Sequence, residues 1–295
     1  MKASIVWYGS FSVIVTPFTK NGDIDEKGYR GIIDFVINAG AHGIISAGST
    51  GEFFLLTNDE RKQIFAIAAD QVNSRIPLLA GVSATRTEDV LDLAKFAEEA
   101  GCDGLMLLPP LYITVDDVEV LKFFTNISDK IDLPIMIYNG ATPNFLSIER
   151  VNRLLEVANI VAIKDSSRNM TQMNDLIRFF GDKIRVFVGE EDLLLPSISM
   201  GAVGSVAMVP QIVGDMAIDL YETAANGQLL KAQELHNKIV RVYDLFKVGS
   251  GYVAIKESMK LLGLPGGYSR PPMQAFNQSQ IEKLKQIFSD VGLLN

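Results

Sequence analysis

A lysine at the end of an apolar run carries the most specific chemistry in this sequence. Lys164 follows Ile-Val-Ala-Ile at 160–163, so its side chain starts inside or at the edge of an apolar interior. An amine attacks a ketone only when it is unprotonated, and apolar surroundings favour that uncharged form. The pattern therefore indicates a lysine that forms a Schiff base. From position alone, a lysine that reaches solvent or pairs with Asp165 is the commoner outcome.

Other polar residues follow apolar runs in the same way. Tyr138 ends the run at 134–138, and a phenol beside an imine can pass protons between substrate and solvent. Tyrosines also end strands as packing residues. The turn Gly-Ser-Thr-Gly at 48–51 offers consecutive backbone N–H groups and two hydroxyls, which suit a carboxylate. A plain glycine-rich turn is the commoner explanation. Glu52, directly after it, is expected to brace the loop as a hydrogen-bond acceptor.

These side chains need a scaffold, and one repeated unit provides it. Apolar runs alternate with amphipathic stretches, as strands buried on both faces alternate with helices in parallel sheets. The expected strands lie at residues 12–15, 43–47, 77–82, 104–108, 134–138, 160–164, 184–188 and 204–208. Eight such units predict an α/β fold, a closed (β/α)8 TIM barrel. An open Rossmann sheet is disfavoured, because the first run leads into Thr-Pro-Phe and not into G-x-G-x-x-G.

Helices are expected between the strands and after the last one. Residues 25–39, 58–72 and 87–100 have helical spacing, and the second of these begins with Asn-Asp-Glu, a cap with an acidic first turn. After the eighth run, residues 229–246, 252–262 and 279–291 indicate three helices without intervening strands. We therefore expect a barrel catalytic domain at residues 1–225 and a three-helix extension at 226–295, packed on the barrel.

Composition narrows the class of protein. The 295 residues are 48% hydrophobic and carry a net charge of −8, with no basic run that would suit nucleic acid or an anionic membrane. Cys102 is the sole cysteine and there are two histidines, so neither a disulfide nor a histidine-rich metal site is expected. The first seven residues lack a signal-peptide core, and no apolar run has the ~20 residues of a membrane span. A cytoplasmic protein is expected.

Together the motifs resemble those of the dihydrodipicolinate synthase/N-acetylneuraminate lyase family of class I pyruvate-dependent aldolases. The similarity runs over nearly the whole chain, and its motifs keep their order and a spacing compatible with a barrel. They are Val15-Thr16-Pro17-Phe18, Gly48-Ser49-Thr50-Gly51-Glu52, Gly81-Val82-Ser83, Pro109-Pro110-Leu111-Tyr112, Ile137-Tyr138-Asn139, Ile163-Lys164-Asp165-Ser166, Leu261-Leu262-Gly263-Leu264-Pro265 and Arg270-Pro271-Pro272.

The resemblance implies roles for these residues. Lys164 would form the imine with pyruvate or another 2-oxo acid, and Tyr138 would act as the acid and base. Thr50 would relay protons between Tyr138 and a Tyr112 supplied by the neighbouring subunit of a homotetramer built from dimers. The imine would serve as electron sink for making or breaking the C3–C4 bond with an aldehyde, without metal or cofactor. The expected substrate-binding residues are Ser49, Thr50, Ser166, Gly189, Glu191 and Val206.

The sequence also departs from the family pattern. Members that use aspartate semialdehyde carry an arginine shortly after the strand-five tyrosine, and residues 139–144 contain none; the usual proline after Asn139 is missing too. Glu191 and Asp192 stand where lyase members bind sugar hydroxyls, and Phe-Phe at 53–54 resembles variants for sugar acids. Arg168 offers a replacement cation, although a solvent-facing arginine is the simpler explanation.

These departures favour an aldolase for a 2-keto-3-deoxy sugar acid, or a related lyase or dehydratase. Dihydrodipicolinate synthase activity, condensing pyruvate with aspartate semialdehyde, is the alternative. A non-catalytic 2-oxo-acid-binding regulatory protein is the alternative from another class. It is disfavoured because Tyr138, Thr50 and Tyr112 are all present. A purely structural barrel explains the polar strand ends least well.

Overall fold

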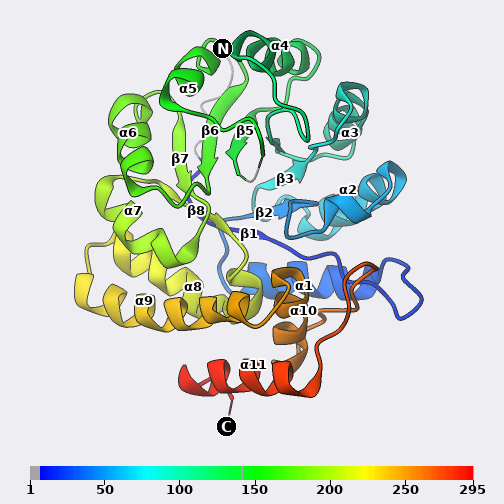
Figure 1. Cartoon of the computed structure of the whole chain (residues 1–295), viewed down its shortest axis with the longest axis vertical. Coiled ribbons are helices and arrows are strands. Elements are labelled where there is room, and N and C mark those ends of the chain that lie inside the picture. The colour runs from blue at the N-terminus through cyan, green and yellow to red at the C-terminus, as the bar shows by residue number, and fades with distance from the viewer. Residues whose placement is uncertain (1–6, 141, 295) are drawn as a thin grey trace.

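Eight parallel strands form a closed barrel in chain order, with β1 pairing β8 (Figure 1). The computed structural model describes residues 7–140 and 142–294, so the expected lack of a signal peptide concerns residues outside the described part. The strands are β1 (Gly9–Val13), β2 (Gly43–Ser46), β3 (Leu78–Gly81), β4 (Gly104–Leu107), β5 (Ile135–Asn139), β6 (Ile160–Asp165), β7 (Arg185–Val188) and β8 (Gly204–Ala207). The predicted TIM barrel is confirmed.

A helix follows each strand and covers the outside of the barrel (Figure 1). These helices are α1 (Glu26–Asn38), α2 (Asn58–Val72), α3 (Thr87–Glu99), α4 (Asp117–Ser128), α5 (Ile148–Leu154), α6 (Met170–Phe180), α7 (Leu194–Met200) and α8 (Pro210–Ala225). Short 3-10 helices η1 (Phe53–Leu55) and η2 (Glu191–Leu193) lie in the loops after β2 and β7. The C-terminal helices are α9 (Leu229–Tyr243), η3 (Asp244–Lys247), α10 (Gly251–Leu261) and α11 (Gln278–Asp290).

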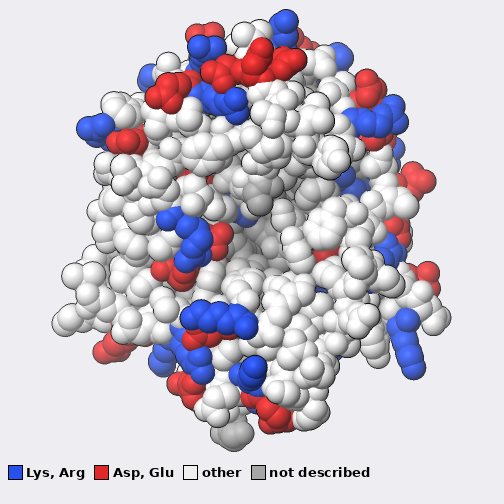
Figure 2. Space-filling model, in the orientation of Figure 1, with Lys and Arg blue, Asp and Glu red and all other residues white. Residues whose placement is uncertain are grey.

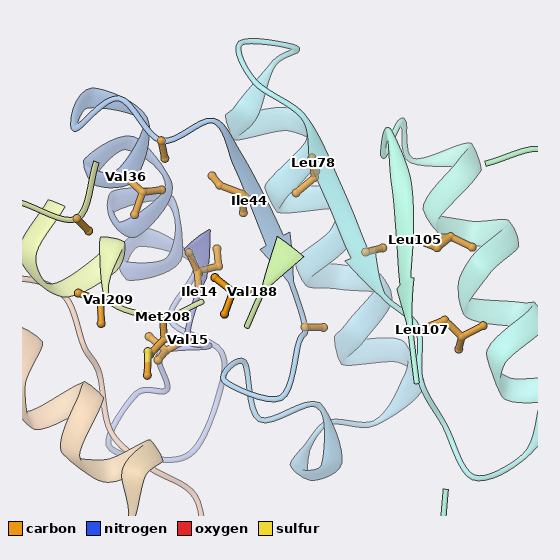
Figure 3. Packing of buried hydrophobic residues seen from close by; sticks show 14 of the residues in the cluster. Ile14, Val15, Val36, Ile44, Leu78, Leu105, Leu107, Val188, Met208 and Val209 are labelled. Carbon is orange, nitrogen blue, oxygen red and sulfur yellow. The ribbon is translucent and has the colours of Figure 1, made fainter. Parts of the chain in front are cut away.

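The apolar residues of the strands divide between two cores. Alternate side chains point into the barrel, where Phe11, Met106 and Phe187 belong to a compact interior cluster. The others meet the helices in a larger cluster, in which Val36 of α1 and Ile44 of β2 point toward each other (Figure 3). Strands buried on both faces explain why the runs lack polar alternation.

Several element boundaries differ from the predictions by a few residues, and two of the differences have a clear physical cause. β1 ends at Val13 and not at Val15, because the side-chain amide of Gln211 bonds the Val13 carbonyl and the Val15 N–H in place of a neighbouring strand. The N-cap of α2 is Thr57, not Asn58, and it forms a capping box with Glu60. A capping box satisfies two helix N–H groups at once, so the hydroxyl one residue earlier is the better cap.

The C-terminal helices pack directly on the barrel. α9 lies along α8, and α10 reaches the loops at the carboxyl ends of the strands (Figure 1). Glu52 of the β2 loop and Lys256 of α10 form an ion pair of 2.5 Å, at 0% and 1% side-chain exposure. Glu52 therefore braces its loop as expected, with a lysine as its partner. The boundary at residues 225 and 226 stays a prediction. None of the helices within 7–140 and 142–294 has the length and apolarity of a membrane span.

The buried Glu52–Lys256 pair predicts a large loss of stability when one partner is removed. In Lys256→Met the Glu52 carboxylate stays buried without its cation, which should lower the free energy of unfolding by about 3–5 kcal/mol. Lys260→Ala breaks an exposed pair with Glu257 and should cost less than about 1 kcal/mol. Adding Glu52→Gln to Lys256→Met should recover part of the loss. Chemical denaturation measures all three, and equal effects of the two single substitutions would refute the prediction.

Candidate active site

Tyr138 and Lys164 lie directly opposite each other on neighbouring strands. The register of β5 and β6 pairs Met136 with Ala162, and two residues later Tyr138 with Lys164. Met136 and Ala162 belong to the interior cluster. Because strand side chains alternate between two faces, Tyr138 and Lys164 share that inward-facing side at the carboxyl end of the barrel. The barrel therefore positions the pair by register alone.

Lys164 is almost removed from solvent. It is 5% exposed, and its Nζ lies 4.2 Å from the centroid of the Tyr138 ring. Asp165 points to the other face of β6, where its carboxylate accepts hydrogen bonds from Asn139 (2.7 Å) and Ser167 (2.7 Å). Among the residues described, Lys164 makes no ion pair. Neither alternative from the sequence, a solvent-exposed lysine or a Lys164–Asp165 pair, describes the structure.

Two glycines leave room around this pair. A Cβ on Gly189 would lie 1.8 Å from Ser166 Oγ and 2.9 Å from Lys164 Cε. A Cβ on Gly140 would lie 2.6 Å from the Tyr138 ring. Ser166 Oγ is buried and has no hydrogen-bond partner in the described part of the chain, so it is available to a ligand.

The Ser49–Thr50 turn faces the same space. Both residues line a cavity of about 650 Å³ together with Tyr138 and Lys164. The turn is fixed by the Glu52 N–H, which donates to the Ser49 carbonyl (2.9 Å). The backbone N–H groups of Ser49 and Thr50 donate no hydrogen bond to a described residue. These donors stand where an anionic group on a ligand of Lys164 would be held.

The C-terminal helices supply a wall of the cavity that the sequence did not reveal. Their lining residues include Val240, Tyr243, Phe246, Lys247, Tyr252 and Ile255. Figure 2 shows the hollow in this face, with basic and acidic side chains against each other beside it. Burial raises the pKa of the Tyr252 phenol. The barrel and the extension therefore form one cavity together.

An ion cluster at the mouth of the cavity combines two residues named in the sequence analysis, Arg168 and Asp192, with Glu190, which was not expected there. Arg168 lines the cavity and bridges Glu190 (3.2 Å) and Asp192, both of which line it too. The Arg168 side chain is half-exposed, and its charge is shared with two carboxylates, so it is not a free cation. Burial raises the pKa of Glu190, while the charges of Lys164 and Arg168 oppose that rise.

Glu191 does not line the cavity, so the prediction that it contacts a substrate is wrong. Its fully buried carboxyl group accepts hydrogen bonds from the Tyr243 hydroxyl (2.9 Å) and the Val209 N–H (3.1 Å). The 3-10 turn of η2 directs it away from the cavity, between β8 and α9. Glu190 and Asp192, its neighbours on either side, carry the acidic groups at the cavity instead.

Of the other residues expected to bind substrate, some line the cavity and one does not. Gly189 and Ser166 line the cavity as expected. The Val206 side chain is fully buried in the interior cluster beneath the cavity, so its expected lining role is corrected to one of support. Tyr112 is 90% exposed with a φ of 70° and does not line the cavity of its own chain.

The buried Glu191 predicts a pH dependence of stability. Burial raises its pKa to about 8 from 4.5, so its stabilising contribution is complete below about pH 4.5 and is lost as the pH rises toward 8. Relative to Glu191→Gln, the free energy of unfolding of the wild type should fall by up to about 1.4 kcal/mol per pH unit between pH 5 and 8. Urea denaturation across this range measures the difference. A constant difference between the two proteins would exclude a protonated Glu191.

Comparison with known proteins agrees with this geometry. The model of the dihydrodipicolinate synthetase family matches residues 7–291. The 4-hydroxy-tetrahydrodipicolinate synthase of Oceanobacillus iheyensis is 32% identical over 281 residues, which cover 95% of each chain. The structure of YagE from E. coli K12 in complex with pyruvate superposes with a TM-score of 0.94 at 26% identity, covering 98% of this chain and 100% of that one.

Another similar structure contains mannosamine in place of pyruvate. The structure of CdNal from Clostridium difficile in complex with mannosamine has a TM-score of 0.91 at 27% identity, over 97% of this chain and 100% of that one. The names of the curated relatives agree better with the synthase alternative than with a sugar-acid lyase. The resemblance seen in the sequence is confirmed. The chain belongs to the dihydrodipicolinate synthetase family, whose members are class I Schiff-base aldolases and lyases.

Proposed function

We propose that the protein forms an imine between Lys164 and pyruvate or another 2-oxo acid, and makes or breaks the C3–C4 bond with an aldehyde. The observation that carries this proposal is the buried Lys164 amine, 4.2 Å from the Tyr138 ring centroid in a large cavity. The pyruvate complexes of YagE and of the Acinetobacter baumannii synthase support a 2-oxo acid as substrate. The Ser49 and Thr50 amides supply donors for its carboxylate.

The chemistry follows from these groups. The Lys164 amine adds to the C2 carbonyl, and the Tyr138 phenol gives its proton to the departing hydroxyl, so that water leaves and the protonated imine forms. The phenoxide formed in this step takes a proton from C3, and the electron pair left behind moves into the imine to give a neutral enamine. The enamine C3 then bonds the aldehyde carbon, whose oxygen takes the proton back from Tyr138. Hydrolysis of the imine releases the product and the lysine, and cleavage runs through the same steps in reverse.

Tyr112 fits a role in a second copy of the chain. Its loop is held by the fully buried Asn144, whose amide donates to the Pro110 (2.7 Å) and Ile113 (2.8 Å) carbonyls. An ordered loop that presents a 90% exposed tyrosine can insert it into a neighbouring cavity. We infer that Thr50 connects Tyr138 to the neighbour's Tyr112 within a homotetramer.

The identity of the aldehyde separates two versions of this function. The names of the relatives favour aspartate semialdehyde and therefore a synthase. The site favours the aldehyde fragment of a 2-keto-3-deoxy sugar acid, because residues 139–144, directly after Tyr138, include no arginine and acidic groups line the mouth of the cavity. A related dehydratase would use the same imine.

Deuterium exchange at C3 of pyruvate tests the imine mechanism. The wild type should exchange these protons in D2O, and Lys164→Arg should abolish the exchange because an arginine forms no imine. Tyr138→Phe keeps the ring beside Lys164 but removes the phenol, and should slow exchange by about 10²–10⁴-fold. Lys62→Ala, which removes a surface lysine paired with Asp92, is the control. Binding of pyruvate without exchange in the wild type would support the regulatory, non-catalytic alternative.

A panel of aldehydes identifies the second substrate. Pyruvate is offered with aspartate semialdehyde, glyceraldehyde or N-acetylmannosamine, and product formation is followed by mass spectrometry. If the site determines the outcome, glyceraldehyde or N-acetylmannosamine should give a kcat/KM at least tenfold above that of aspartate semialdehyde. Efficient turnover of aspartate semialdehyde alone would identify a synthase and exclude the sugar-acid version.

A further inference from the structure

Arg168 occupies a backbone conformation that suits glycine better. Its φ is 57°, in the left-handed region, where a side chain other than that of Gly, Asn or Asp is strained. It stands four residues after Lys164, and its half-exposed side chain lines the cavity. A strained residue held in place beside a reactive group indicates that its side chain has a function there.

Three N–H groups of that side chain contact the carboxylates of Glu190 and Asp192. Its Nη2 contacts Asp192 Oδ2, and its Nη1 donates to Asp192 Oδ1 (3.2 Å) and to Glu190 Oε2 (3.2 Å). The Tyr243 hydroxyl approaches the same Glu190 oxygen (3.4 Å) from α9. The other oxygen, Glu190 Oε1, has no partner among the described residues. Arg168 and Tyr243 thus fix Glu190 so that one oxygen remains available at the cavity.

The charges around the mouth leave no free cation for a ligand. Apart from Lys164, the charged residues that line the described cavity are the cations Arg168 and Lys247 and the anions Glu190, Asp192 and Asp244. Lys247 pairs with Asp244 (2.6 Å). Lys247 and Asp244 balance each other, and Arg168 balances only one of Glu190 and Asp192. The charged residues at the mouth, without Lys164, therefore carry one net negative charge.

We propose that Arg168 is a positioning and specificity residue that holds the Glu190–Asp192 pair ready for hydroxyl groups and, by being held itself, excludes aldehydes with an anionic terminus. This inference rests on the proposed imine function and defines the class of its second substrate as an uncharged, hydroxylated aldehyde. A phosphate or carboxylate at the mouth would face both Glu190 and Asp192, whose combined charge exceeds that of Arg168. A hydroxyl group donates to Glu190 Oε1 without breaking any described contact.

Two aldehydes of matched carbon skeleton test the proposal, D-glyceraldehyde and its 3-phosphate. Each kcat/KM for condensation with pyruvate is divided by the C3 exchange rate of the same preparation, so that any loss of folded enzyme cancels. The wild type should prefer the uncharged aldehyde at least tenfold. Arg168→Gly suits the left-handed backbone and removes the whole side chain with its guanidinium. It should raise the KM for glyceraldehyde about tenfold without improving use of the phosphate, and Arg168→Lys should recover part of that loss.

Releasing Arg168 provides the opposite test. The double variant Glu190→Gln/Asp192→Asn removes both carboxylates, and the freed guanidinium should reverse the preference toward the phosphorylated aldehyde. Arg178→Ala, which removes a surface arginine paired with Asp175, should leave the preference unchanged.

The outcomes separate this proposal from the function on which it rests. A wild type that exchanges pyruvate C3 protons yet prefers the phosphorylated aldehyde, and loses this preference in Arg168→Gly, overturns the proposal alone, because Arg168 would then be an anion receptor. An unchanged preference in the double variant also overturns it. A wild type without any C3 exchange overturns the imine function and this proposal with it.

Discussion

The structure depends on keeping one amine away from water at the end of a closed barrel. Lys164 is 5% exposed because β6 places it on the inward face and the Tyr138 ring covers it. The register of two parallel strands fixes both side chains, and the tightly packed interior beneath them prevents the barrel end from collapsing. Gly189 keeps the space beside the amine open. Positioning and desolvation thus come from the scaffold, as preorganised catalysis requires.

The C-terminal helices complete this site and are not an independent appendage. α10 carries Lys256, whose buried pair with Glu52 fixes the loop that presents Ser49 and Thr50. α9 carries Tyr243, which bonds Glu191 and approaches Glu190 after β7. Substitutions in either helix should therefore change both the shape of the cavity and the stability of the barrel loops.

The sequence predicted what strand periodicity determines, and it failed where loops and helix docking decide. Eight apolar runs were enough to predict the barrel, and the place of Lys164 and Tyr138 at strand ends followed from it. The alternation of side chains stops at the end of a strand. It therefore did not reveal that η2 turns Glu191 toward Val209 and Tyr243 and away from the cavity, while its neighbours face the cavity. The cavity wall from α9 and α10 was not predictable either, because helical spacing shows which face is apolar but not where that face docks.

Family membership establishes the class of enzyme, and the residues at the mouth of the cavity carry the proposal about its second substrate. The central claim, however, concerns Lys164 itself. Borohydride reduction in the presence of saturating pyruvate, followed by peptide mass mapping, tests it most directly. The account predicts a reduced pyruvyl adduct on Lys164 and on no other lysine. An unmodified Lys164 under these conditions would contradict the account.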